Sequence, residues 1–144
     1  MNKEFIEYEQ ALALKELGFD EPCFTFYPKE GKMGFDGKYH SIKEGYKNST
    51  VNAIWIKRYK KDFECVTAPL YQQAFIWFIE KHGIFVSIVP NRHGSLDSFI
   101  GWIYVPLNGS TKDINVGDYK IGFKTYEEAE QACLIKLIEI VKNK

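Results

Sequence analysis

The chain contains 144 residues, of which 45% are hydrophobic and 16% aromatic, and its 19 basic and 19 acidic residues cancel. This composition excludes an intrinsically disordered chain and is typical of one domain that buries its own core. The balanced charge excludes a global field that would attract nucleic acid or an anionic membrane, so a local patch has to supply any such binding.

The N-terminal residues and the cysteines predict a cytoplasmic protein. The opening sequence MNKEFIE lacks the apolar core of a signal peptide, and no apolar run approaches the roughly 18 residues that span a bilayer. Cys23, Cys65 and Cys133 are odd in number and far apart. This pattern favours reduced thiols over a disulfide framework.

The first part of the chain predicts one helix and two strands. Residues 3–17 are rich in Glu, Ala, Leu and Lys, and Gly18 stands where a C-terminal cap belongs. Residues 23–27 form a short β-prone run, and residues 51–59 are rich in β-branched and aromatic side chains. The glycines and lysines of residues 28–48 predict a long hairpin or a mobile loop between these strands.

A basic patch lies in the second predicted strand and consists of Lys57, Arg58, Lys60 and Lys61 around Tyr59. Lysine and arginine contact phosphates, and aromatic side chains stack on unpaired bases, so this patch is a candidate nucleic-acid-binding site. Acidic residues dilute it, however, and lysines on an exposed strand also protect a sheet edge from pairing.

The middle of the chain predicts a second helix that begins at Thr67-Ala-Pro-Leu and ends before Gly83. His82 precedes that glycine, where a protonated imidazole would suit the helix dipole. Five consecutive apolar residues, Phe75–Ile79, sweep the whole circumference of this helix. Ile76 and Trp77 fall outside its main apolar face, so they are either buried by a second layer or exposed to a partner.

Two further strands, Ile84–Pro90 and Ser98–Val105, predict a β-hairpin, and residues 119–123 predict a last strand. The polar loop of the hairpin carries Arg92, His93 and Asp97. These side chains are candidates for acid/base chemistry or anion binding, although any solvated loop contains a similar mixture. The histidines and cysteines lack the spacings of a zinc site, and we expect no metal.

The C-terminal helix has the clearest start in the sequence, because Thr125 and Glu128 form a capping box. Its predicted buried stripe consists of Tyr126, Ala129, Cys133, Leu137 and Ile140. Cys133 on this stripe is expected to be an inert core residue. Ile135 and Ile138 fall outside the stripe, so either a second layer covers them or they face a partner.

These elements predict an α+β fold in a single domain over residues 1–144, with the order α-β-β-α-β-β-β-α. An antiparallel sheet of four to six strands would pack against three helices.

Three segments carry a family resemblance: YEQALALKELGFDEPC, APLYQQAFIWFIEKHG and YEEAEQACLIKLIEIVKNK. With them the chain resembles a family of short uncharacterised proteins encoded by phages and prophages of gut bacteria. The family has no assigned activity, so the resemblance transfers no catalytic or binding residue. It implies an accessory phage protein that acts on or alongside host machinery in the cytosol of a bacterium.

The leading hypothesis is a small non-enzymatic protein that binds another protein or itself as a homodimer, with Ile76, Trp77, Ile135 and Ile138 as candidate contact residues. The alternative is a nucleic-acid-binding module that uses the basic patch. A hydrolase-like enzyme that uses His93 and Asp97 comes third. We expect no cofactor and no membrane partner.

Overall fold

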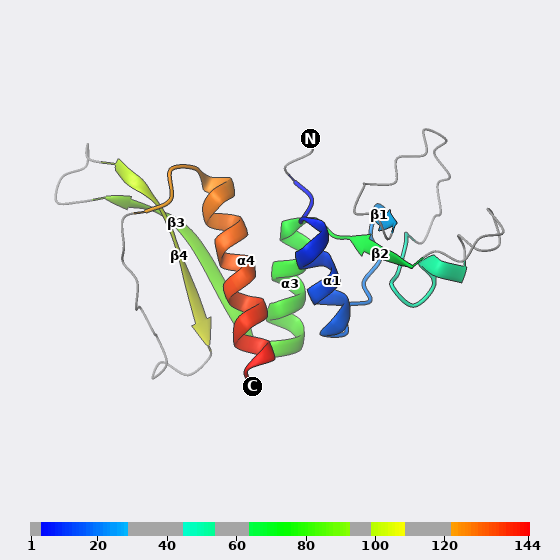
Figure 1. Ribbon diagram of the computed structural model, residues 1–144. Coiled ribbons are helices and arrows are strands. Elements are labelled where there is room, and N and C mark those ends of the chain that lie inside the picture. The colour runs from blue at the N-terminus through cyan, green and yellow to red at the C-terminus, as the bar shows by residue number, and fades with distance from the viewer. Residues whose placement is uncertain (1–3, 29–44, 54–63, 93–98, 109–121) are drawn as a thin grey trace. The chain divides into compact units, whose positions relative to one another are not determined.

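The computed structural model describes residues 4–28, 45–53, 64–92, 99–108 and 122–144. Its elements are α1 (Tyr8–Glu16), β1 (Thr25–Pro28), β2 (Cys65–Ala68), α3 (Tyr71–His82), β3 (Ile84–Arg92), β4 (Phe99–Asn108) and α4 (Tyr126–Lys142), shown in Figure 1. The chain divides into two compact units, Met1–Leu70 and Tyr71–Lys144.

The mixture of helices with antiparallel strands agrees with the predicted fold class at this coarse level. In the described ranges the strands form two separate two-stranded antiparallel ladders, β1–β2 and β3–β4. The predicted sheet of four to six strands and its element order are therefore not confirmed. The single domain over residues 1–144 stays a prediction.

In the first unit, α1 begins at Tyr8 and not at residue 3 as predicted. The reason is that the preceding residues are extended. Phe5 forms an antiparallel bridge with Leu70, and the Ile6 N–H donates to the Pro69 carbonyl over 3.1 Å. A backbone held in this extended pairing cannot also form the first helical turn.

The end of α1 lies where the sequence predicted it. Gly18 has a φ of 93°, a conformation that glycine adopts without strain. Its N–H donates to the Lys15 carbonyl over 3.0 Å, and the Phe19 N–H donates to the Leu14 carbonyl over 2.9 Å. These two bonds form a Schellman motif, and the buried Phe19 and Leu14 supply the apolar residues that accompany it.

The strand predicted over residues 51–59 is wrong at its described start, because residues 51–53 are helical; residues 54–59 lie outside the described ranges. The unit's second strand is β2, and its last two residues, Thr67 and Ala68, are strand and not the predicted start of a helix. It pairs with β1 so that Thr25 lies opposite Ala68 and Pro28 opposite Cys65.

Side chains occupy the edge of β2 that faces away from β1. The Thr67 N–H donates to Asn48 Oδ1 over 3.0 Å, and the Cys65 N–H donates to Asn52 Oδ1 over 2.6 Å. Lys15 Nζ donates to the Cys65 carbonyl over 3.2 Å. These bonds satisfy backbone groups that would otherwise form a template for another strand.

In the second unit, α3 begins at Tyr71, four residues later than predicted, and ends where the sequence indicated. Gly83 has a φ of 66°, and its N–H donates to the Ile79 carbonyl over 3.0 Å. The chain then turns directly into β3. The predicted hairpin is confirmed: β3 pairs antiparallel with β4, with Ile84 opposite Asn108 and Val89 opposite Ile103.

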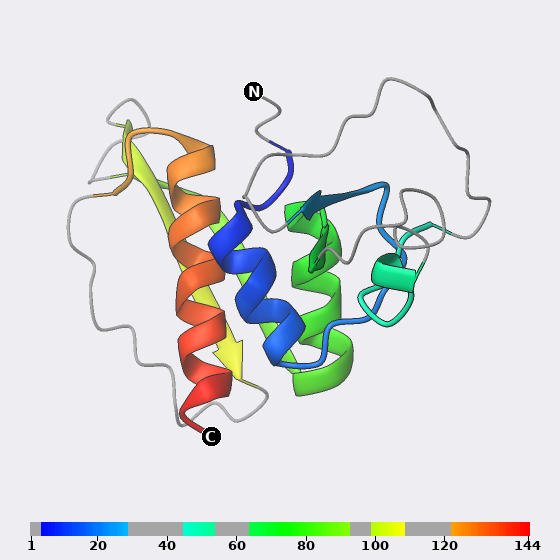
Figure 2. The same ribbon diagram turned by 45° about the vertical axis from the view of Figure 1, so that its right-hand side comes forward.

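Helix α4 lies next to this hairpin (Figures 1 and 2) and contacts both of its strands, whereas α3 contacts β3. Helix α4 also packs against α3. The capping residue is confirmed: the Glu128 N–H donates to Thr125 Oγ1 over 3.2 Å. The Glu128 carboxylate accepts from the Lys124 N–H over 3.1 Å, one residue before the position that the capping box predicts.

The buried side of α4 is wider than the predicted stripe. Ala129, Cys133 and Leu137 are buried as expected, and Leu134 and Ile138 join them. Tyr126 was expected inside and is 41% exposed. The wider buried side follows from two sets of neighbours, because α4 packs both on the hairpin and on α3.

Candidate protein-binding surface

Two of the four predicted contact residues are buried. Trp77 is 3% exposed, and its ring lies 5.1 Å from that of Phe78 and 4.9 Å from that of His82. Ile138 is 7% exposed. The structure therefore corrects the expectation that these side chains face a partner, and the first of the two alternatives, burial by a second layer, applies to both.

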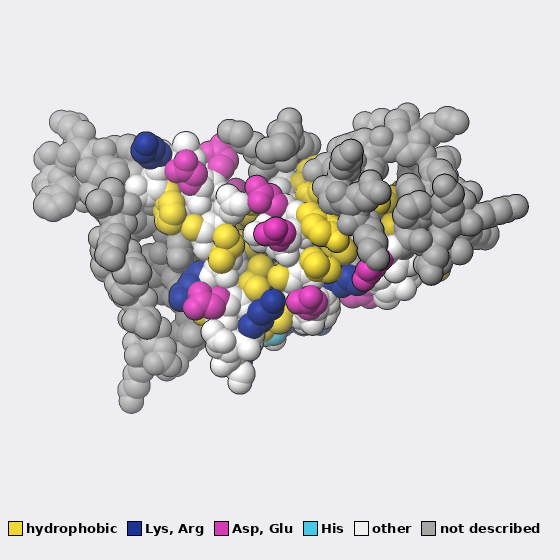
Figure 3. All heavy atoms as spheres, in the orientation of Figure 1, with side chains coloured by type: hydrophobic (Ala, Val, Ile, Leu, Met, Phe, Trp, Pro, Cys, Tyr) yellow, Lys and Arg dark blue, Asp and Glu magenta, His cyan; other side chains and the backbone are white. Residues whose placement is uncertain are grey.

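The other two predicted contact residues are exposed but isolated. Ile76 is 46% exposed and Ile135 is 47% exposed. Ile76 lies one helical turn from the exposed Gln72 and from the exposed Glu80. Ile135 shares its side of α4 with charged residues, and Figure 3 shows Lys and Glu side chains interrupting the hydrophobic ones over this helix. Single exposed apolar side chains of this kind are common on protein surfaces.

A more continuous apolar surface lies on β3. Phe85 is 50% exposed and Val89 is 37% exposed, whereas Ile84 is fully buried. Successive side chains of a strand point to opposite faces, so Phe85 and Val89 share the face that the helices leave open. We call the face that carries Phe85 and Val89, with Ser87 between them, the β3 outer face.

In the backbone register, the residues of β4 that lie opposite this part of β3 are apolar by sequence. Leu107 is paired with Phe85, Val105 with Ser87, and Ile103 with Val89. Residues 84–90 also contain no charged side chain. Soluble proteins commonly protect exposed strands with lysine or other charges, and β3 lacks that protection over these residues.

Sequence reasoning predicted the hairpin but missed Phe85 and Val89 as surface residues. The sequence IFVSIVP could have indicated them, because apolar residues occupy the positions that point to one face of the strand and also those that point to the other. A strand that is apolar on both faces is typical of a sheet covered on both sides, whereas a strand with one wet face alternates with polar residues. The helices of this unit cover one of the two faces of β3, and Phe85 and Val89 lie on the other.

The cysteines are buried thiols with suppressed ionisation. Burial raises the pKa of Cys133 to about 12, with a smaller contribution from Glu130. Burial likewise raises the pKa of Cys23 to about 12 and raises that of Cys65 despite the nearby Lys15 charge. Because the thiolate is the reactive form, burial disfavours the reactive state of all three cysteines, and the prediction that Cys133 lies in the core is confirmed.

The remaining candidate residues fall largely outside the described ranges. This holds for Lys57, Arg58, Lys60 and Lys61 of the basic patch and for His93 and Asp97 of the polar loop. Arg92 is the last residue of β3. The nucleic-acid and enzyme alternatives therefore stay predictions from sequence.

Among the described side chains, no three His, Cys, Asp or Glu residues gather in a group that could hold a metal ion. Within the same ranges, no helix is both long enough and apolar enough to cross a membrane. No protein-family model, curated protein or solved structure matches the chain.

Proposed function

We propose that this chain is a small non-enzymatic accessory protein that acts by binding another protein through the β3 outer face. The observation that carries the proposal is the pair of exposed apolar side chains, Phe85 and Val89, on a strand segment without charge. The phage or prophage setting and the bacterial cytosol rest on the family resemblance of the two ends and the middle helix.

The chemistry of the surface supports a protein partner. Aromatic side chains are enriched at the centres of interfaces, and charged residues are depleted there. Complete burial of a Phe side chain stabilises by roughly 1.5–3 kcal/mol, so covering the exposed half of Phe85 would contribute about 1 kcal/mol. Phe85 is the residue best suited to act as an anchor, with Val89 two strand repeats further along the same face.

The size of the surface indicates what kind of interface it forms. A two-stranded ribbon of nine residues per strand is roughly 30 Å long and about 10 Å wide, or on the order of 300 Å² per face. A stable interface covers about 800 Å² on each partner. The β3 outer face thus fits a short-lived complex, or the apolar centre of an interface whose rim includes other residues.

Affinity capture from the bacterial host tests this proposal. The wild type and a Phe85→Ser/Val89→Ser variant would serve as baits, with Ile76→Ser as a matched control that removes an equally exposed apolar side chain. We expect a protein, identified by mass spectrometry, to be retained by the wild type and the control and lost from the double variant. Circular dichroism would verify that all three baits are folded.

Light scattering on the purified baits distinguishes self-association from binding to another protein. If the surface joins two copies of this chain, the wild type is dimeric and the double variant monomeric. Equal retention of every captured protein by all three baits, together with unchanged mass in solution, would contradict the proposed role of the β3 outer face.

A further inference from the structure

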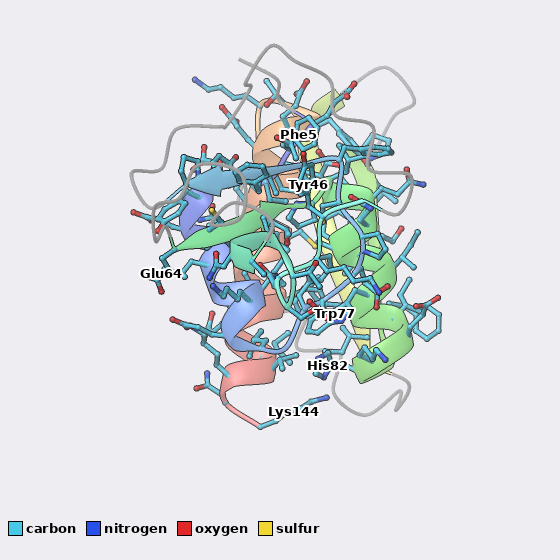
Figure 4. All side chains as sticks on the ribbon, turned by 90° about the vertical axis from the view of Figure 1, so that its right-hand side faces the viewer. Phe5, Tyr46, Glu64, Trp77, His82 and Lys144 are labelled. Carbon is cyan, nitrogen blue, oxygen red and sulfur yellow. The ribbon has the colours of Figure 1, made fainter. Side chains whose placement is uncertain are left out.

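A histidine lies in an aromatic cluster at the C-terminal end of α3. The His82 ring is 4.9 Å from the Trp77 ring at an interplanar angle of 70°, and 5.9 Å from the Phe78 ring at 41°. Its Nε2 atom is buried and has no hydrogen-bond partner in the described part of the chain. Figure 4 shows His82 beside Trp77 at the end of the helix that Gly83 terminates.

A positive charge lies near this histidine. The Lys144 side chain extends toward His82 (Figure 4). On α3, Lys81 is the adjacent residue, while Glu80 lies on the opposite side of the helix by the 100° repeat. Residues 84–90 of β3 contain no titratable group, and the last turn of α4, which packs against α3, carries both Glu139 and Lys142.

These surroundings oppose a charge on the imidazole. Burial lowers the pKa of His82, and the charge of Lys144 lowers it further. The sequence had suggested a protonated His82 that complements the helix dipole, and the structure corrects this: near neutral pH the neutral ring is favoured. A protonated ring would place a charge on a buried nitrogen that has no acceptor among the described residues.

We propose that His82 is an acid-sensitive element that holds the junction of α3 and β3 closed in its neutral form and loosens it when protonated. The junction depends on the bond from the Gly83 N–H to the Ile79 carbonyl, one turn from the aromatic cluster. Loosening there would move β3, which begins at Ile84 and carries the β3 outer face. The acid response itself does not depend on the proposed binding function.

The direction of the pH effect follows from proton uptake. Because the pKa of His82 is lower in the folded chain, the unfolded chain binds the proton first as the pH falls. The stability contribution is complete above about pH 6.5, the ordinary pKa of histidine. It declines as the pH falls from there through the pKa of the folded state.

The first test is an NMR titration of the wild-type imidazoles, with His82 assigned by comparison with His40→Gln and His93→Gln variants. We expect His82 to titrate below pH 6.5 and the exchange of the Gly83 amide to accelerate over the same pH range. A midpoint at or above 6.5 would mean that the aromatic rings stabilise the imidazolium by cation–π contact, and it would overturn the proposal.

The second test compares melting temperatures at pH 7.5 and pH 5.0. The His82→Phe variant keeps a ring in the cluster but cannot titrate, and the His40→Gln/His93→Gln variant retains only His82. We expect the wild type and the double variant to lose the same number of degrees on acidification, and His82→Phe to lose clearly fewer. An equal loss of melting temperature in His82→Phe would contradict the proposal that His82 is the acid-sensitive element. If that variant does not fold, the NMR titration of the wild type tests the proposal by itself.

Discussion

At the scale of single residues, Asn48 links separate segments of the first unit through its side-chain amide. Its Nδ2 donates to the Phe19 carbonyl over 2.7 Å, and its Oδ1 accepts from the Thr67 N–H over 3.0 Å. The first bond reaches the end of α1 and the second reaches β2. Thr67 is fully buried, so water cannot easily replace that acceptor.

We therefore expect Asn48→Ala to lower the free energy of unfolding by about 2–3 kcal/mol, because it leaves a buried donor and a carbonyl without partners. Thr50→Ala is the control, since Thr50 is exposed and its hydroxyl makes only a 3.4 Å bond to the Lys47 carbonyl. Urea denaturation of both variants checks the prediction. A similar small loss in the two would show that Asn48 has no such linking role.

Two glycines with positive φ differ in their surroundings. A Cβ at Gly45 would lie 2.9 Å from Pro22 Cβ and 3.1 Å from the Cys23 carbonyl oxygen, whereas a Cβ at Gly18 would meet nothing within 4 Å. Both backbones are left-handed, with φ values of 73° and 93°. Only Gly45 therefore combines backbone strain with a steric overlap on substitution.

Gly18→Ala should cost about 1–2 kcal/mol from the left-handed backbone alone. Gly45→Ala should cost more, because the overlap involves backbone and a rigid proline ring that cannot move away cheaply. Thermal denaturation of the two variants at one pH measures the difference. If Gly18→Ala were the more destabilising substitution, the close approach of Gly45 to Pro22 and Cys23 would be incorrect.

At the scale of elements, the start of α4 depends on a single hydroxyl. Thr125 Oγ1 accepts from the Glu128 N–H, and the Glu128 carboxylate satisfies the Lys124 N–H. Thr125→Ala should cost about 1 kcal/mol, whereas Thr125→Ser, which keeps the hydroxyl and is at least as good an N-cap, should leave the stability nearly unchanged. We expect a lower melting temperature without loss of partner binding, and binding lost from a folded Thr125→Ala variant would contradict this.

Helix ends were the elements best predicted from sequence, because their signals are local. Gly18, Gly83 and Thr125 each mark a boundary that a few neighbouring residues determine. Strand β2 was missed because four residues, Cys-Val-Thr-Ala, carry no periodicity of their own and pair with a segment about 40 residues earlier. Such pairing depends on contacts that one sequence does not display.

The candidate protein-binding surface was also predictable only where local signals determine it. The apolar circumference of α3 was evident from sequence, but Ile76 and Trp77 are adjacent residues and only tertiary packing exposes one and buries the other. Phe85 and Val89 could have been identified from the two apolar faces of β3. Identifying them also required knowing which face the helices cover, and that information comes from the structure.

At the scale of the whole molecule, the two units differ in whether polar side chains protect their strands. In the first unit, the amides of Asn48 and Asn52 and the ammonium of Lys15 occupy the outer edge of β2. In the second unit, β3 presents Phe85 and Val89 without a charged neighbour among residues 84–90. Because the net charge is zero, the chain as a whole does not repel a neutral or a charged partner over long distances.

We propose that the partner binds the β3 outer face and not the exposed sides of the helices. The most direct test is the dissociation constant of the purified captured partner, or of the dimer, measured by calorimetry for Phe85→Ser/Val89→Ser and for Ile76→Ser/Ile135→Ser. We predict that the first variant weakens binding tenfold or more, which corresponds to at least about 1.4 kcal/mol, and that the second stays within about twofold of the wild type. Strong weakening by the helix variant with unchanged binding by the β3 variant would show that the partner binds the helices instead.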